Sequence, residues 1–352
     1  MNILLVFLFF MLPNSSLSYS PVSVAPVTVQ SQDEKEDEKL YKKGKSLSEQ
    51  KQFKEAAEAY REATRKNPLH FDAWVSLSYV CIEAGQYNEA VAAAEQALKL
   101  KPDNSSANNN LGYSLTQLGR YAEAVSFLEK SIQVNPSYYL SHNNLGFAFF
   151  KLGRNEEAIE ELKKSISLNS NYEKSYGNLV NTYMRLGRPK DALEYQQQVV
   201  RLKPNESKSF ALLAVIHMNL GDREKGAESF GRALELDPTN ADAALNYGMA
   251  NLMIGKLDIA EANLQKAIKL KPNEIDYFIY LGRIQLQAAH YDDAINTFRE
   301  AVHLKPESTE AIFSLGQALV QRGDREAAKE QYNILKLLNP DLAEKLLKAI
   351  EK

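Results

Sequence analysis

Three consecutive asparagines, Asn108, Asn109 and Asn110, stand in a stretch whose apolar spacing is that of a helix. Asparagine is a poor residue for a helix interior, because its short amide competes for the backbone's own hydrogen bonds. The same amide offers two donors and one acceptor, so it can bind the backbone of an extended peptide whatever its sequence. The chemistry that these residues favour is hydrogen-bonded recognition.

Residues that could carry out a reaction are scattered along the chain. No phosphate-binding glycine loop, zinc-binding helix motif or nucleophile elbow occurs in the sequence. The histidines share no spacing that would bring them together with the single cysteine, and these residues are His70, His142, His217, His290, His303 and Cys81. A catalytic centre needs such groups within mutual reach. The sequence therefore predicts a protein that is not an enzyme and that holds no cofactor and no metal.

Composition narrows the class of partner. The chain has 352 residues, of which 44% are hydrophobic and 25% charged, as is usual for a soluble globular protein. The net charge of −3 disfavours a nucleic-acid partner, since proteins of that class usually carry a basic excess or stripe. One cysteine cannot form an intramolecular disulfide, so stability must come from packing.

An internal repeat of 34 residues organises almost the whole chain. Prolines fall at positions 68, 102, 136, 204, 238, 272, 306 and 340, with Ser170 at the one missing place in the series. The pattern defines nine units over residues 37–342 without insertion or deletion. Large and small residues alternate at helical spacing, which predicts two closely packed helices in each unit. Glycines that can adopt the left-handed conformation between the two helices recur at 85, 119, 153, 187, 221, 255 and 323.

This pattern resembles the tetratricopeptide repeat, and the resemblance covers 306 of the 352 residues. The unit over residues 71–104 shows it best, with Trp74, Leu77, Gly85, Tyr87, Ala90, Ala97 and Pro102 at family positions. The resemblance implies an all-α fold, a right-handed superhelix (α-solenoid) of nine helix-turn-helix units with a concave inner face. The apolar face of the C-terminal tail, which includes Leu346, Leu347 and Ile350, predicts a capping helix that ends within residues 343–352.

In this family the first helix of each unit lines the inner face, so the resemblance places a row of amides, aromatic rings and charges there. The candidate peptide-binding residues are Tyr79, Asn109, Asn110, Tyr113, Asn143, Asn144, Phe147, Phe150, Lys174, Asn178, Asn181, Arg185, Lys208 and Asn246. Tyr138, Tyr139 and Tyr172 add to an aromatic zone at the unit joints. Two structural alternatives remain open: the amides could bond only to neighbouring helices, and the rings could be packing between units. No unit has lysine at repeat position 5, which disfavours the clamp for chaperone C-termini known in the family.

The N-terminus predicts export. Residues 3–12 form an apolar run of ten, which is the size of a signal-peptide core and too short to span a bilayer comfortably. Small residues around Ser16 and Ser18 place a cut between Ser18 and Tyr19, giving a signal peptide over residues 1–18. Residues 19–36 then form a flexible linker and a charged helix start. An uncleaved membrane anchor and a misassigned start codon are the alternatives.

Together these features predict an exported, non-catalytic adaptor that binds a protein or an extended peptide on its concave face. A bacterial periplasm is the favoured setting, and the chain is expected to be a monomer or to self-associate weakly. One rival is a structural scaffold that binds partners through its convex face or its ends. Another is an accessory arm that presents substrates to a separate enzyme.

Overall fold

The computed structural model describes residues 35–352, so the predicted leader and most of the linker lie outside the described residues. Within residues 35–352 the chain forms nineteen α-helices and no strand. The first helices of the nine units are α1 (Glu36–Glu49), α3 (Phe71–Glu83), α5 (Ser105–Gln117), α7 (Tyr139–Lys151), α9 (Glu173–Arg185), α11 (Ser207–Leu220), α13 (Ala241–Met253), α15 (Ile275–Gln287) and α17 (Thr309–Arg322). The second helices are α2 (Phe53–Lys66), α4 (Tyr87–Leu100), α6 (Tyr121–Val134), α8 (Asn155–Leu168), α10 (Pro189–Leu202), α12 (Arg223–Leu236), α14 (Leu257–Leu270), α16 (Tyr291–Leu304) and α18 (Arg325–Leu338), and α19 (Pro340–Ile350) follows them.

The turn inside each unit uses the left-handed conformation that the glycines predicted. All seven of those glycines have positive φ, from 67° to 94°. The two units without the glycine place Lys51 and Ala289 in the same conformation, with φ of 60° and 62°. The packing of the flanking helices therefore imposes this turn even on residues for which it is strained.

Small residues let the two helices of a unit approach closely. A Cβ atom on Gly112 of α5 would lie 2.5 Å from Leu128 Cγ of α6, and one on Gly146 of α7 would lie 2.6 Å from Leu162 Cγ of α8. The alanines that face them, Ala124 and Ala158, are fully buried. The alternation of small and large residues seen in the sequence is thus the contact between paired helices.

The C-terminal helix seals the last unit. Leu346 and Ile350 of α19 are buried in one cluster with Leu335 of α18. A Cβ on Gly316 of α17 would lie 2.5 Å from Leu346 Cδ2, so α19 sits where the helix of a further unit would pack. The predicted capping helix is confirmed.

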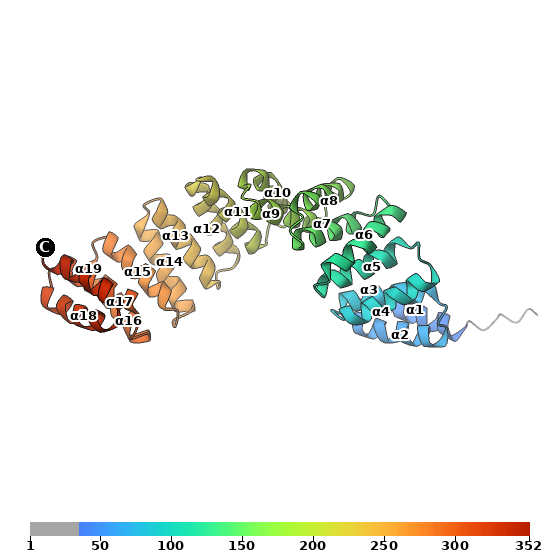
Figure 1. Cartoon of the computed structure of the whole chain (residues 1–352), viewed down its shortest axis with the longest axis horizontal. Helices are drawn as coiled ribbons and strands as arrows, with labels where there is room; N and C mark the ends of the chain where they lie inside the picture. Colours follow the sequence, from blue (N-terminus) through green and yellow to red (C-terminus); the bar gives the residue numbers. More distant parts are fainter. Residues whose placement is uncertain (1–34) are drawn as a thin grey trace, which may run out of the picture.

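Stacking of the helix pairs produces an arc-shaped molecule (Figure 1). Every helix packs on the one before and the one after it. Consecutive first helices also contact one another directly from α1 through α9, and again between α15 and α17, whereas direct packing between consecutive second helices is weaker throughout residues 35–352. The first helices therefore lie on the inner side of the curve, and this side positions the candidate site.

Candidate peptide-recognition surface

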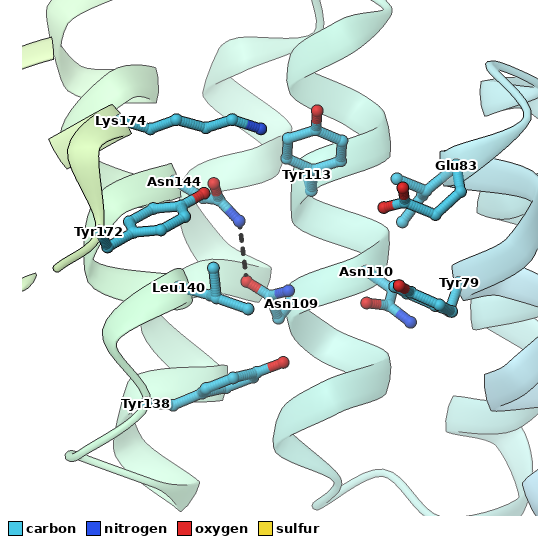
Figure 2. Close-up of a pocket in the computed structure, with 11 residues that line it drawn as sticks. Tyr79, Glu83, Asn109, Asn110, Tyr113, Tyr138, Leu140, Asn144, Tyr172 and Lys174 are labelled. Carbon is cyan, nitrogen blue, oxygen red and sulfur yellow. Dashed lines mark hydrogen bonds between the residues drawn. The ribbon is translucent and has the colours of Figure 1, made fainter. Parts of the chain in front are cut away.

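A pocket of about 140 Å³ opens on the first helices of the second to fifth units (Figure 2). Its walls come from α3, α5, α7 and the start of α9, and the residues that line it are Tyr79, Ile82, Glu83, Asn109, Asn110, Tyr113, Tyr138, Leu140, Asn144, Tyr172 and Lys174. Residues almost a hundred positions apart in the chain thus meet at one place. We call this site the tyrosine pocket.

Four tyrosine side chains line the tyrosine pocket. Tyr79 is 46% exposed, and Tyr113, Tyr138 and Tyr172 are half-buried. Burial raises the pKa of all four phenols, and the Glu83 carboxylate raises the pKa of Tyr79, Tyr113 and Tyr172 further. The phenols are therefore neutral near pH 7. The Tyr138 hydroxyl bonds to Ser106 and the Tyr172 ring packs against Tyr139, so Tyr79 and Tyr113 are the rings with the most surface available to a ligand.

The asparagine amides form a ladder between successive first helices. Asn109 Oδ1 accepts from Asn144 Nδ2 at 2.9 Å (dashed in Figure 2) and from Ser141 Oγ at 3.2 Å. One unit later, Asn143 Oδ1 accepts from Asn178 Nδ2 at 3.0 Å and from Ser175 Oγ at 3.2 Å. We call these bonds the Asn–Ser ladder. They show that part of the amide chemistry is structural.

Asn108, the first of the three asparagines, has a different structural task. Its Nδ2 donates to the carbonyl of Pro102 at 3.0 Å and to that of Asn104 at 2.8 Å. In the preceding unit Trp74 Nε1 donates to the carbonyl of Pro68 at 2.9 Å, and His142 and Tyr176 bond to the equivalent carbonyls in the next two units, so this repeat position ties the second to fifth units to the end of the unit before. This satisfies a carbonyl that the end of the preceding helix leaves free.

Some polar groups at the tyrosine pocket are not used by the fold. Asn109 Nδ2 and Asn110 Oδ1 take part in no hydrogen bond within residues 35–352, although Asn110 Nδ2 donates to Ser78 Oγ at 2.9 Å. Both residues are largely buried and line the pocket, so its wall holds one donor and one acceptor that the fold does not use. A ligand backbone needs such a pair.

Other predicted residues lie further along the inner face or away from it. Asn143 is buried in the ladder and does not line the pocket. Phe147 and Phe150 are half-buried beneath cations of the chain itself, Lys151 at 5.3 Å and Arg185 at 4.7 Å from the ring centroids. The remaining predicted residues do not join the tyrosine pocket either, and they are the half-buried Asn178 and the exposed Asn181, Lys208 and Asn246.

Three pocket residues were not predicted, namely Ile82, Glu83 and Leu140. The repeat offered a signal for two of them. Glu83 occupies the same repeat position as Arg185, and Leu140 the same position as Lys174, both of which were predicted. Comparing equivalent positions across units would have found these two residues.

Groups that could support other functions are few in the described part of the chain. No cluster of three or more metal-ligating side chains occurs in residues 35–352. None of the nineteen described helices is long and apolar enough to cross a bilayer. The thiol of Cys81 is buried, which raises its pKa to about 12 and keeps it protonated.

Sequence models of the tetratricopeptide repeat match residues 41–85, 82–139, 173–206, 211–275 and 285–350, and a model described as TPR repeat matches residues 148–187. The chain belongs to the tetratricopeptide repeat family. A separate comparison with curated protein sequences gives no significant match.

Solved structures of this family share the fold. The C-terminal part of a TPR repeat-containing protein from Cytophaga hutchinsonii is 18% identical, with a TM-score of 0.61 over 68% of this chain and 99% of that one. PilW, a type IV pilus biogenesis factor, is 22% identical, with a TM-score of 0.54 over 58% of this chain and 94% of that one. Pseudomonas aeruginosa pilF is 19% identical, with a TM-score of 0.51 over 59% and 94% of the two chains. At these identities the similarity shows the fold of this tetratricopeptide repeat protein.

Proposed function

We propose that this tetratricopeptide repeat protein is a non-catalytic adaptor that binds an extended segment of a partner protein along its inner face. The observation that carries the proposal is the tyrosine pocket, where neutral phenol rings surround a free amide donor and a free amide acceptor. Exposed tyrosines beside polar groups are the usual composition of a protein-recognition centre.

Affinity capture with the mature chain tests this proposal. The native protein is compared with a Tyr79→Ala/Tyr113→Ala variant and with a Lys99→Ala/Lys269→Ala variant on the exposed side of α4 and α14. A groove-bound partner is retained by the native chain and the lysine variant and lost from the tyrosine variant. A partner retained equally by all three folded proteins would contradict binding at the tyrosine pocket.

A structural scaffold is a second candidate, because the C-terminal end of the molecule carries an unusual apolar surface. Leu337 of α18 is 86% exposed and lies near the exposed Ile334. The equivalents of Leu337 in the other eight units are all polar, namely Arg65, Lys99, Gln133, Ser167, Arg201, Glu235, Lys269 and His303. If this end joins a partner, Leu337→Lys abolishes capture while Tyr79→Ala/Tyr113→Ala does not.

We also propose that the adaptor works outside the cytoplasm, in the bacterial periplasm or an equivalent exported space. The support is the ten-residue apolar run and the small residues around Ser18. Intact-mass measurement of the protein from its source checks this. A chain that begins at Tyr19 is expected, and a chain that retains residues 3–12 in a soluble fraction would contradict it.

A further inference from the structure

Two opposite charges stand at the tyrosine pocket without a partner. Glu83 of α3 and Lys174 of α9 take part in no hydrogen bond or ion pair within residues 35–352. Just before the second helix α6, Arg120 pairs with Glu123 at 2.6 Å, and comparable pairs stand at the starts of α8 and α10. In Figure 2 the Glu83 carboxylate and the Lys174 ammonium extend toward Tyr113 from opposite sides. The pocket is therefore dipolar across its width.

The aromatic rings of the inner face divide into two groups. Phe147 and Phe150 are covered by Lys151 and Arg185 of the chain itself. No cation of residues 35–352 lies over any of the four pocket tyrosines, as the ring contacts of the described chain show. Ring faces beside a carboxylate attract a cation, through the quadrupole of the ring and the charge of the acid. At the α3 end of the pocket a cationic group from outside would fill this place.

We propose, on the basis of the function proposed above, that the partner segment carries a basic residue followed or preceded closely by an acidic residue. The arginine or lysine side chain lies between Tyr79 and Tyr113 and pairs with Glu83. The acidic residue pairs with Lys174 at the α9 end. Asn109 Nδ2 and Asn110 Oδ1 hold the backbone between the two charges.

The size of the pocket fits this occupant. Its volume of about 140 Å³ is close to that of an engineered cavity of roughly 150 Å³ that binds benzene, so it accommodates a single large side chain. One long basic side chain fills it, and the rest of the segment must lie in the open groove, where an extended strand advances about 3.3 Å per residue.

Synthetic peptides test the charges one at a time. Fluorescein-labelled, serine-rich peptides contain arginine and aspartate separated by one to four serines, and matched peptides replace arginine by norleucine, aspartate by asparagine, or both. Fluorescence anisotropy measures their affinity for the mature chain and for the Glu83→Gln, Lys174→Gln, Tyr79→Ala/Tyr113→Ala and Asp276→Asn variants. Asp276 is an exposed, unpaired acid of α15 and serves as the matched control.

A double-mutant cycle identifies the pairing. Replacing arginine in the peptide, or Glu83 in the protein, is expected to weaken binding about tenfold, and the two changes together are expected to cost no more than either alone. Aspartate and Lys174 should be coupled in the same way, and Asp276→Asn should change nothing.

The outcomes separate this proposal from the function on which it rests. If the neutral peptide binds as tightly as the charged one and the tyrosine variant still loses it, the groove binds peptides and the charge pairing is wrong. If arginine matters equally in the native protein and in Glu83→Gln, the assignment to Glu83 is wrong. Binding of no peptide by the native chain would contradict the charge pairing, and the affinity capture with Tyr79→Ala/Tyr113→Ala decides the proposed function independently.

Discussion

Single asparagines of the inner face divide their hydrogen-bonding groups between the fold and the groove. Both amide atoms of Asn143 form hydrogen bonds within the chain. Its Oδ1 accepts from Ser175 and Asn178, and its Nδ2 donates to Asn144. Asn109 contributes its oxygen to the ladder and leaves its nitrogen open at the tyrosine pocket. Of the two alternatives that the sequence left open, the structural role is shown for the oxygen of Asn109, and the recognition role of its nitrogen is part of our proposal.

The ladder predicts that replacing a buried ladder asparagine destabilises the protein more than replacing an exposed one. Asn143→Ala leaves buried donors without an acceptor, and we expect it to lower the free energy of unfolding by about 1–3 kcal/mol. Asn181→Ala removes an exposed amide that has no bond in the described chain. It should change the free energy of unfolding by less than about 0.5 kcal/mol. Urea denaturation of both variants measures this. Equal effects would contradict a structural ladder.

His142 forms a buried ion pair beside the ladder. Its Nδ1 lies 2.6 Å from Glu161 Oε2, and its Nε2 lies 2.9 Å from the carbonyl of Pro136. Burial alone would lower the pKa of His142, but these hydrogen bonds outweigh it and the pKa is raised. Burial alone would raise the pKa of Glu161, but bonds from His142 and Lys164 lower it. Since both ring nitrogens face acceptors, the imidazolium is the form that fits.

The pair predicts a pH dependence of stability. The raised pKa of His142 gives a stabilisation that is complete below its ordinary value of 6.5 and is lost as pH rises through the folded-state value. The lowered pKa of Glu161 gives a contribution that is complete above 4.5 and is lost on further acidification. The native urea midpoint should therefore rise between pH 8 and pH 6 by more than that of His142→Gln. Parallel pH profiles of the two proteins would contradict this assignment.

Within the helices, glycine has two roles that the structure separates. Gly112 is required for close approach, since an added Cβ would lie 2.5 Å from Leu128 Cγ. We expect Gly112→Ala to destabilise the protein by about 1–3 kcal/mol. Gly177 of α9 has no atom within 4 Å of a built Cβ, so Gly177→Ala should stabilise it by roughly 0.5–1 kcal/mol. Thermal or urea unfolding measures the change in the free energy of unfolding for each variant. A change of the same sign in both variants would contradict the packing described.

At the turns between paired helices, exchanging glycine and alanine should change the free energy of unfolding in opposite directions at two equivalent positions. Ala289 adopts φ of 62°, where glycine is favoured, and Gly255 holds the equivalent place one unit earlier with φ of 76°. Ala289→Gly should raise the free energy of unfolding by roughly 0.5–1 kcal/mol, and Gly255→Ala should lower it by about as much. Hydrogen exchange of the flanking helices locates the change. An unaltered exchange rate in α15 and α16 for Ala289→Gly would contradict strain at this turn.

The sequence was sufficient for the helices and their pairing, and insufficient for the details of the site. A 34-residue period with glycine at the turns determines helix, turn and contact, because every unit repeats the same local physics. The site depends on differences between units, such as Glu83 beside three tyrosines that stand in other units. Those differences follow no period. Asn109 and Asn143 occupy the same repeat position and both accept from a serine, but only Asn143 also donates to the asparagine that follows it, and no repeat pattern distinguishes the two.

Over the whole molecule, the Asn–Ser ladder occurs where consecutive first helices pack directly on one another. The Asn–Ser ladder runs from α5 to α9 and stops where Gly177 replaces the next asparagine, and direct contact between first helices also weakens beyond α9. The N-terminal half therefore has a closely packed inner face that holds the tyrosine pocket. The C-terminal half carries the exposed Leu337 on α18, where the scaffold alternative places its contact.

Site-specific photo-crosslinking in the cells of origin tests the central proposal most directly. The photoreactive residue p-benzoylphenylalanine replaces Tyr113 in one protein and Leu337 in another, and mass spectrometry identifies the cross-linked peptide. We predict that Tyr113 captures an extended partner segment with basic and acidic residues close together, and that Leu337 does not capture it. Capture of a partner at Leu337 alone, with none at Tyr113, would contradict peptide recognition by the inner face.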